Sequence, residues 1–557
     1  MLDPVHEECG IAAIYRLGSG GGNPPESGRA AGSDNVAPLL ARMLMDLQNR
    51  GQLAAGISSF NPRRGKLLDT YKQLGPVGEV FRTNHSGKHQ SIMERYAGIA
   101  AIGHVRYATC GQDDINYAQP FECPHGRKWK CYAFCFNGNI ANYAECREKI
   151  LARGDYHLMR DNDTEIIMHH LSRGLKGDAK PDLVHVFRQM DEDFDGAYCL
   201  AFLNADGDLV LARDPHGFRP LCYAVKGDLF AAASESVALA SLDFDDIRTL
   251  EPGCLIHVRS DGIKIHRFAP VRRRAHCQFE WVYFSNVAST INDRSVYLSR
   301  QRMGEELARG EKISLGPDCV AVPVPDTAKA TCDAMASVLG IPSREGLIRN
   351  RYVGRTFIEG KSRQEKALRK YTPLPEVLSG KRVFLVEDSI VRSTTLRIII
   401  KMVRERGQAK EVHVRVACPP VVAPCAYGID MSTVKELFAA RFIDHPVRED
   451  LPEALAARLA ADLGADSLRY LSINALPRCI DLPEKDLCLA CLTGEYPTPW
   501  GQKLYQVAQD NCRRGVVEGR TYEQVIPRTK IGAGLVHQPT DSAPQPATLD
   551  PRPAAKG

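Results

Sequence analysis

The string KRVFLVEDSIVRSTTLRIIIKMV, residues 381–403, constrains the fold more than any other part of the chain. An apolar run from Val383 to Val386 ends in two carboxylates, Glu387 and Asp388, and a turn then leads into an amphipathic run with helical spacing. A continuous apolar strand followed directly by such a helix is typical of a parallel sheet covered by helices on both faces. Ligands of these sheets bind at the carboxyl ends of the strands, so the acidic pair is predicted to lie at a binding site.

The same strand-then-helix rhythm extends from about residue 277 to about residue 471. CVAVPVP (319–325) precedes the helical pattern KATCDAMASVLG (329–340), and VHVRVACP (412–419) follows the helix of the first string. Upstream, from Cys9 to about Arg274, short β-type runs such as GIAAIY, AGIAAIGHVRY and AYCLAFL alternate with turns and a few helical stretches. This upstream half is predicted to be stacked antiparallel sheets flanked by helices.

Length and composition exclude several classes of protein. A chain of 557 residues is too long for one core, which favours two domains with appendages. The net charge of +5 is small and no long basic run occurs, so we expect no nucleic-acid partner. No apolar run approaches the ~20 residues of a membrane helix, and MLDPVHEE lacks the features of a signal peptide. We therefore expect a cytoplasmic protein without a membrane partner.

In a reducing compartment the 18 cysteines are expected to serve metal binding, catalysis or burial and not disulfides. Cys9, in HEECGIAAIY, is the first of them. A lone cysteine is usually a small buried hydrophobe. A cysteine that becomes residue 1 of a mature chain instead carries its own base, since an α-amino group has a pKa of ~7.7–8.0. A thiolate that cleaves an amide also needs oxyanion donors and groups that hold the charged end of the substrate.

The turn SIVRSTT, residues 389–395, opens the helix behind the acidic pair, so its N–H groups and hydroxyls suit an anion. The whole string resembles the phosphoribosyl pyrophosphate (PRPP) signature of type I phosphoribosyltransferases. The resemblance implies that Glu387 and Asp388 bind the ribose hydroxyls. It also implies a lining for the 5′-phosphate pocket: Ser389, Arg392, Ser393, Thr394 and Thr395. Two residues depart from that family's pattern, because Glu387 replaces its usual aspartate and Ser393 its usual glycine.

Two further segments agree with a PRPP site. Asp326 and Lys329 in VPVPDTAKA follow a predicted strand, where a loop would meet pyrophosphate and Mg²⁺. The expected Mg²⁺ ligands are Asp326, Glu387 and Asp388. The basic segment 349–370 is expected to close over a polyanion.

Four strings of the first half resemble class II glutamine amidotransferases of the N-terminal nucleophile fold. They contain Arg106 in GHVRYATCG, Asn137 and Gly138 in CFNGNIANY, Asp163 in DNDTEIIMHHL, and Arg50 in LQNRGQ. By this resemblance Cys9 attacks the glutamine amide, and the Asn137 side chain with the Gly138 N–H forms the oxyanion hole. Arg106, Asp163 and Arg50 bind glutamine. Met1 to Glu8 are then a propeptide whose removal makes Cys9 residue 1.

A glutaminase followed by a PRPP-binding transferase resembles the amidophosphoribosyltransferase family. The resemblance implies that ammonia from the first site displaces pyrophosphate from PRPP to give 5-phosphoribosylamine, the first committed step of de novo purine biosynthesis. It also implies a homo-oligomer, either a dimer or a homotetramer, with feedback inhibition by purine nucleotides. Two alternatives remain: a glutaminase-coupled transferase with a different sugar phosphate or acceptor, and a non-catalytic sensor of glutamine and nucleotides.

The expected fold is an α+β αββα sandwich of the N-terminal nucleophile type, followed by an α/β parallel-sheet phosphoribosyltransferase domain. The expected divisions are a propeptide (1–8), the amidotransferase domain (9–275), the transferase domain (276–480), a C-terminal segment with cluster cysteines (481–535) and a disordered tail (536–557).

Four cysteines occupy the cluster positions of this family: Cys277 in HCQFEWVYF, Cys425 in PCAYGID, and Cys488 and Cys491 in CLAC. Four thiolates suit a [4Fe–4S] cluster, although zinc accepts the same set. We expect the cluster, in a structural role.

A second group, Cys123, Cys131 and Cys135 with His125, is compatible with a metal site, but buried strand thiols are the favoured interpretation.

Overall fold

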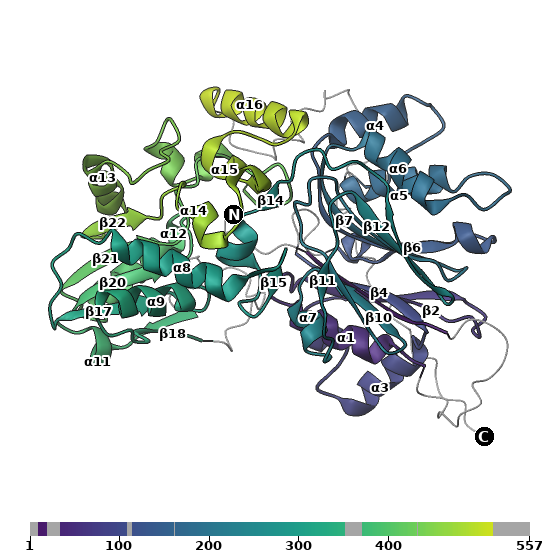
Figure 1. The fold of residues 1–557 in the computed structure, drawn as a ribbon, viewed down its shortest axis with the longest axis horizontal. Coiled ribbons are helices and arrows are strands. Elements are labelled where there is room, and N and C mark those ends of the chain that lie inside the picture. The colour runs from purple at the N-terminus through teal and green to yellow at the C-terminus, as the bar shows by residue number, and fades with distance from the viewer. Residues whose placement is uncertain are drawn as a thin grey trace, which may run out of the picture.

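The computed structural model describes residues 9–18, 34–107, 114–160, 162–350, 370–431 and 433–515. Figure 1 shows a sandwich of two sheets on one side and a smaller parallel-sheet unit on the other, with the last helices above their junction. Four regions of the sequence lie wholly or mostly outside the described residues: the expected propeptide (1–8), a Gly/Ser/Pro-rich stretch (17–35), the basic segment (349–370) and the tail (536–557). Within the described ranges, every helix is too short or too polar to cross a lipid bilayer.

A seven-stranded antiparallel sheet carries the predicted nucleophile. The run GIAAIY forms its central strand, β1, because alternate residues are buried on both faces of the sheet. In spatial order the strands are β11 (Arg248–Thr249), β9 (Cys222–Lys226), β10 (Leu229–Ala233), β1 (Gly10–Arg16), β4 (Ala100–Arg106), β2 (Ala54–Phe60) and β3 (Leu68–Leu74).

A six-stranded antiparallel sheet faces the first one. In spatial order its strands are β13 (Gly262–Arg267), β12 (Cys254–Arg259), β8 (Leu209–Arg213), β7 (Gly196–Asn204), β6 (Tyr132–Ile140) and β5 (Phe121–Cys123). Apolar side chains from both sheets, such as Ile11, Ile102 and Leu211, form one buried cluster between them. The sheets therefore share a core and fix each other's position.

Helices cover the two outer faces of the sandwich, which confirms the predicted αββα architecture. On the seven-stranded sheet lie α1 (Ala37–Asp46), α2 (Val77–Val80), α3 (Ser86–Arg95) and α7 (Val237–Ala240). On the six-stranded sheet lie α4 (Tyr143–Leu151), α5 (Asp163–Gly174) and α6 (Leu183–Asp193). The amphipathic spacing of APLLARMLMD places Leu40, Met43 and Leu44 against the sheet, as helical periodicity predicts.

The second domain is built on a parallel sheet, as its strand-then-helix rhythm predicts. The strand order is β17 (Cys319–Pro323), β20 (Arg382–Glu387), β21 (Glu411–Val416) and β22 (Ser467–Tyr470), all parallel. Around it are α8 (Val296–Arg309), α9 (Lys329–Leu339), α12 (Thr394–Glu405) and α13 (Glu453–Leu463). Short elements complete the domain: β15 (Thr290–Ile291), β16 (Arg294–Ser295), β18 (Leu347–Arg349), β19 (Tyr371–Pro373), α11 (Pro375–Leu378) and α14 (Leu476–Ile480).

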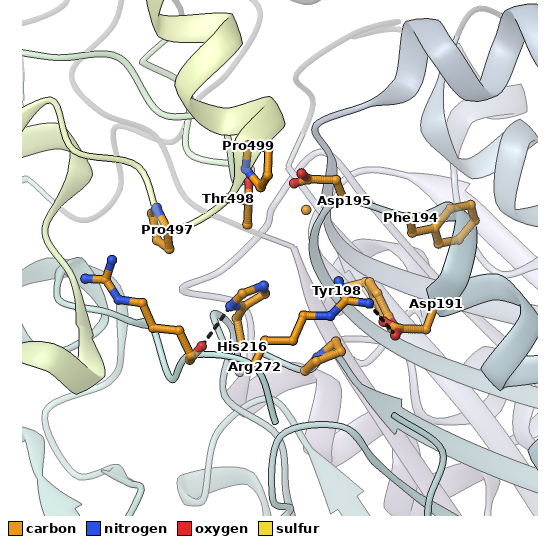
Figure 2. A pocket seen from close by; sticks show the side chains of 12 residues that line it. Asp191, Phe194, Asp195, Tyr198, His216, Arg272, Pro497, Thr498 and Pro499 are labelled. Atoms are coloured by element: carbon orange, nitrogen blue, oxygen red, sulfur yellow. Dashed lines mark hydrogen bonds and ion pairs between the residues drawn. The ribbon is translucent and has the colours of Figure 1, made fainter. Parts of the chain in front are cut away.

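The C-terminal segment ties the two halves together. Its strand β23 (Leu487–Cys488) pairs in parallel with β14 (His276–Cys277) at the start of the second half. The helices α15 (Ala490–Thr493) and α16 (Pro499–Arg513) follow. Asp195 of the sandwich accepts a hydrogen bond from the Trp500 N–H at 3.0 Å, beside a cavity of about 280 Å³ between the sandwich and the start of α16 (Figure 2).

A buried ion-pair network also crosses the junction. Arg50 is 1% exposed, and its Nε lies 2.6 Å from a carboxylate oxygen of Glu235 in the sandwich. Its Nη2 lies 2.5 Å from Glu280, in the segment that leads into the transferase domain. Glu280 also pairs with Arg219 at 3.7 Å. Because these side chains are almost completely shielded from water, each charge depends on its partners.

We predict that Arg50→Met lowers the free energy of unfolding by about 3–5 kcal/mol, because Glu235 and Glu280 are left buried with one cation fewer. Urea unfolding followed by fluorescence measures the change. Arg248→Met is the matched control, since Arg248 pairs with Asp246 at the exposed surface and its loss is expected to leave the free energy of unfolding nearly unchanged. Equal effects of the two substitutions would contradict the role of the network.

Candidate functional site

Cys9 lies immediately before β1, at the end of the central strand of the seven-stranded sheet. In the antiparallel pairing of β1 with β4, Gly10 is opposite Val105, so Cys9 comes beside Arg106 at the end of β4. The Cys9 thiol is partly exposed and donates to the Tyr107 carbonyl, with 3.6 Å between sulfur and oxygen. The sequence signals at both positions therefore meet at one end of the sandwich.

The expected oxyanion donors lie on β6 of the facing sheet. Asn137 is 2% exposed, and its Nδ2 is buried without a hydrogen-bond partner among the described residues. Gly138 has φ +152°, and a Cβ there would lie 2.0 Å from the Ala197 carbonyl oxygen. Only glycine fits this position. An unpartnered buried amide is costly in a resting protein, and it is ready to donate to a charge that develops in a reaction.

The two residues expected to clasp glutamine flank these strands. Arg106 is 4% exposed, with its guanidinium 5.7 Å from the centre of the Tyr117 ring. Asp163 begins α5, which Asn162 caps by accepting from the Glu165 N–H. One Asp163 carboxylate oxygen lies 3.4 Å from the N–H of Ile140, at the end of β6. Asp163 is thus held close to β6, the strand that carries Asn137 and Gly138.

Arg50 was expected to bind glutamine, and the structure shows what its guanidinium contacts in this state. It holds Glu235 and Glu280, and it also donates to the Ser285 hydroxyl at 3.0 Å. Sequence reasoning did not find this interdomain contact, because Glu280 is 230 residues away in the chain. The role of Arg50 in binding glutamine stays a prediction.

In the second domain the acidic pair lies where β20 ends. Asp388 accepts from the Ser389 hydroxyl at 2.6 Å and from the Thr327 hydroxyl. Glu387 curls back and accepts from the Asp388 N–H at 3.1 Å. Burial raises the pKa of both carboxyls, and the neighbouring Asp388 charge adds to the rise at Glu387. Because burial disfavours their ionised forms, these carboxyls are suited to bind a cation or the hydroxyl groups of a ligand.

The turn behind the pair is built as a helix N-terminus. Ser393 precedes α12 with φ +63°, a left-handed conformation, and it is 7% exposed. This is the position where the resembled family usually has glycine, and the backbone keeps the glycine-like conformation here. Thr394 and Thr395 form the first residues of α12, so their N–H groups are available to an anion.

Three other expected PRPP residues have charged partners in this structure. Arg392 contacts Glu436 at 2.7 Å and donates to the Asp430 carbonyl at 2.9 Å. Lys329 pairs with Glu345 at 2.7 Å, and Asp326 pairs with Arg349 at 3.0 Å, both at the exposed surface. Exposed pairs of this kind are weak, so a bound polyanion can replace the acidic partner of Lys329 at little cost.

Sequence reasoning missed three residues beside the acidic pair. Thr327 donates to Asp388, as described above. Tyr371 of β19 is buried, and burial followed by the charge of Glu387 raises the pKa of its hydroxyl. Burial lowers the pKa of Arg300 to about 10, and the charges of Asp388 and Glu235 oppose this shift. Thr327 lies within VPVPDTAKA, next to Asp326, but its hydroxyl was not among the expected site residues.

The four expected cluster thiols come from separate segments that meet at the junction. Cys277 is directly opposite Cys488 in the β14–β23 pairing, and Cys491 follows in α15. The pKa of Cys491 is raised by burial and then by the neighbouring thiols of Cys418, Cys488 and Cys425. In the part of the chain that the structure describes, no three His, Cys, Asp or Glu side chains converge closely enough to hold a metal ion. The donor set fits a thiolate-bound group in chemistry, but its thiols are not arranged around one point.

The second cysteine group follows the strand pattern. Cys123 ends β5, Cys131 precedes β6, and Cys135 is fully buried between the two sheets. His125 accepts from the N–H of Arg127 at 2.9 Å in a turn.

Comparisons with known proteins agree with this geometry. Residues 104–241 match the family model described as "Glutamine amidotransferase domain". The amidophosphoribosyltransferase of Methanothermobacter thermautotrophicus is 38% identical over 92% of this chain and 99% of its own length. That of Bacillus subtilis is 33% identical over 90% of this chain and 96% of its own length.

Two solved structures have the same fold over most of the chain. One is the glutamine PRPP amidotransferase from B. subtilis complexed with ADP and GMP, with a TM-score of 0.74 and 31% identity, covering 89% of this chain and 98% of that chain. The other is described as the allosteric regulatory enzyme of purine biosynthesis, with a TM-score of 0.75 and 32% identity, covering 89% of this chain and 97% of that chain.

We predict that Ser393→Gly raises the free energy of unfolding by about 1 kcal/mol, because a side chain in the left-handed region costs ~1–2 kcal/mol that glycine avoids. Chemical denaturation measures the change. Ser337→Gly in the last turn of α9 is the matched control and is expected to lower stability by about 0.5 kcal/mol. A loss of stability at both positions would show that Ser393 is not strained.

Proposed function

Because the chain belongs to the amidophosphoribosyltransferase family, we propose that it moves the amide nitrogen of glutamine to PRPP through the residues described above. Glutamine and water give glutamate and ammonia, and ammonia and PRPP then give 5-phosphoribosylamine and pyrophosphate. The observation that carries the assignment of roles is the pair of sites in one chain. A partly exposed thiol begins one sheet of the sandwich and a buried, unpartnered amide lies on the facing sheet, while a buried acidic pair ends a parallel strand in the second domain.

In the first reaction the Cys9 sulfur attacks the side-chain carbonyl carbon of glutamine. The proton of the thiol passes to the α-amino group of Cys9, which exists once Met1 to Glu8 have been removed. Asn137 Nδ2 and the Gly138 N–H donate to the oxygen as it becomes negative. Ammonia leaves, and water releases glutamate from the sulfur. Arg106 and Asp163 hold the α-carboxylate and α-amino group of the substrate.

In the second reaction the acidic pair and its turn orient PRPP. Glu387 and Asp388 bind the ribose hydroxyls, and the start of α12 with its hydroxyls binds the 5′-phosphate. Lys329 lies at the pyrophosphate end. Asp326, Glu387 and Asp388 would hold Mg²⁺ together with PRPP, and the ion would supply positive charge near the leaving pyrophosphate. Ammonia attacks C1 of the ribose, the bond from C1 to the pyrophosphate oxygen breaks, and the amine loses a proton.

We extend the proposal to regulation, assembly and location. The B. subtilis neighbour is complexed with ADP and GMP, and purine nucleotides are expected to compete with PRPP here as feedback inhibitors. Inhibition kinetics at several PRPP concentrations test this. A homodimer or homotetramer is tested by light scattering, and a cytoplasmic location by cell fractionation.

We predict that Cys9→Ala abolishes glutamine-dependent formation of pyrophosphate while at least half of the activity with high ammonia remains, because the transferase site does not use the thiol. Pyrophosphate release with each nitrogen donor measures this. The mature wild type is also expected to begin at Cys9 by intact mass, whereas Cys9→Ala retains Met1 to Glu8.

Cys146→Ala is the matched control, since this buried thiol lies in α4 away from β1, and both activities should remain. Equal loss with glutamine and ammonia in Cys9→Ala would contradict the division into two sites. Full activity of wild type that retains Met1 would contradict the role of the Cys9 amine.

We also propose that Cys277, Cys425, Cys488 and Cys491 bind a [4Fe–4S] cluster that ties the C-terminal segment to the transferase domain. Burial raises the pKa of Cys488 to about 12, so thiolates at this junction need the compensating charge of a bound metal group. The thiols must move closer together around the cluster than they lie here.

We predict about four irons and four sulfides per chain after anaerobic purification, in keeping with four-thiolate ligation. Cys491→Ser should lose most of the iron, whereas Cys512→Ser, near the end of α16, should keep it. Iron, sulfide and zinc analysis with the visible spectrum measures this. Stoichiometric zinc without iron would contradict the cluster and leave a zinc site.

A further inference from the structure

Strand β6 carries Asn137 and Gly138. The neighbouring strand β5 stops pairing with β6 before these two residues are reached. On that edge β5 pairs with β6, and its first residue, Phe121, is opposite Phe134. Continuing the antiparallel register by two residues brings Gln119 opposite Phe136. Pro120 intervenes and has no N–H to donate. The backbone pairing of β5 therefore ends at Phe134, with two residues left between it and Asn137, where the oxyanion donors begin.

The side chain of Gln119 takes the place of the missing strand. Its Oε1 accepts from the Phe136 N–H at 2.6 Å, and its Nε2 donates to the Phe136 carbonyl at 3.3 Å. A side-chain amide has both a donor and an acceptor, as a peptide group has. The two hydrogen bonds therefore replace those that one residue of a neighbouring strand would make with Phe136. Gln119 is 6% exposed, which keeps water from competing for the two hydrogen bonds.

His104 supplies a second donor to the same carbonyl. Its Nε2 lies 3.2 Å from the Phe136 oxygen. Because a carbonyl only accepts, Nε2 carries the proton, and Nδ1 is buried without a hydrogen-bond partner among the described residues. Burial, with the charge of Arg106, lowers the pKa of His104 to about 3, so the ring is neutral in any working range of pH.

His104 also connects the two sheets. It lies on β4, opposite Ile11 of β1 and two residues before Arg106. Its contact with Phe136 therefore runs from the sheet that carries Cys9 to the strand that carries the oxyanion donors. The distance between the nucleophile and those donors depends on this contact and on the Gln119 pair.

We propose that Gln119 and His104 are positioning residues, which fix the Phe136 peptide and thereby aim Asn137 Nδ2 and the Gly138 N–H at the substrate oxygen. Neither residue contacts the reacting atoms. The inference rests on the proposed function, since it assigns Asn137 and Gly138 to the oxyanion hole. A displacement of about 1 Å in such donors is enough to cost up to ~100-fold in rate.

Gln119→Met tests the proposal, because methionine keeps the length of the side chain and removes both hydrogen bonds. The kcat for glutamine hydrolysis is expected to fall about 10- to 100-fold, with the KM for glutamine unchanged within about twofold. Ammonia-dependent activity and the rate of Cys9 alkylation by iodoacetamide should not change, because neither uses the oxyanion donors. Gln90→Met, the same change in the exposed part of α3, is the control and should keep wild-type kinetics.

A double-mutant comparison separates positioning from general destabilisation. In an Asn137→Ala background, whose main donor is already absent, Gln119→Met should cost less than about threefold more. An equal additional loss in both backgrounds, or a change in KM alone, would overturn the proposal.

The histidine gives an independent test. His104→Leu should reproduce the fall in kcat, and His104→Gln, which retains a donor, should recover part of it. If Gln119→Met loses the ammonia-dependent reaction as well, it has not folded, and wild-type kinetics of His104→Leu would then overturn the proposal. A wild-type enzyme that hydrolyses no glutamine would instead refute the proposed function.

Discussion

The buried ion pairs of Arg50 are the interaction on which the rest of the structure depends. One guanidinium holds Glu235 of the sandwich and Glu280 of the segment that enters the second domain. The side chain of Arg50 also packs beside Gly10, where an added Cβ would lie 3.2 Å from the Arg50 Cδ. The residue after the nucleophile, the core of the sandwich and the interdomain segment therefore meet at one cation. Removing one partner leaves an uncompensated charge in the protein interior, so substitutions at this junction are expected to destabilise the fold.

A second buried arginine extends the same arrangement towards the PRPP site. Arg300 of α8 donates to the carbonyls of Trp281, Tyr283 and Ser285 at 2.9, 3.0 and 2.8 Å. Its positive charge interacts electrostatically with the carboxylates of Asp388 and Glu235. Arg50 and Arg300 thus both bind the segment from residue 280 to 285, Arg50 through the side chains of Glu280 and Ser285 and Arg300 through backbone carbonyls. This short segment therefore contacts a side chain from the sandwich and a side chain from α8 of the second domain.

The sequence predicts local structure well where one periodicity dominates. GIAAIY, RVFLVED and TTLRIIIKMV became strands and a helix because burial and propensity agree in each. Contacts such as Arg50 with Glu280, or Gln119 with Phe136, were not predicted, because they join segments whose pairing no local pattern encodes. Cys277 and Cys488 show the intermediate case. Both were predicted as cluster ligands from the family resemblance. The parallel pairing of β14 with β23, which brings them opposite each other, was not predicted.

The two departures of the PRPP signature have different physical consequences. Ser393 keeps the left-handed backbone of a glycine, so the turn retains its shape at the cost of local strain. At the acidic pair, the longer side chain of Glu387 folds back onto the Asp388 N–H, whereas Asp388 contacts Ser389 and Thr327. Burial raises the pKa of Asp388, the hydrogen bonds from Ser389 and Thr327 and then the charge of Arg300 oppose that rise, and the charge of Asp388 adds to the rise at Glu387. Two adjacent carboxyls in one dry site do not both ionise readily, so the proton favours Glu387 and the negative charge favours Asp388. The glutamate therefore makes the pair unequal: Asp388 is the better acceptor for ribose hydroxyls and for Mg²⁺, and Glu387 joins it once a bound cation stabilises the second charge.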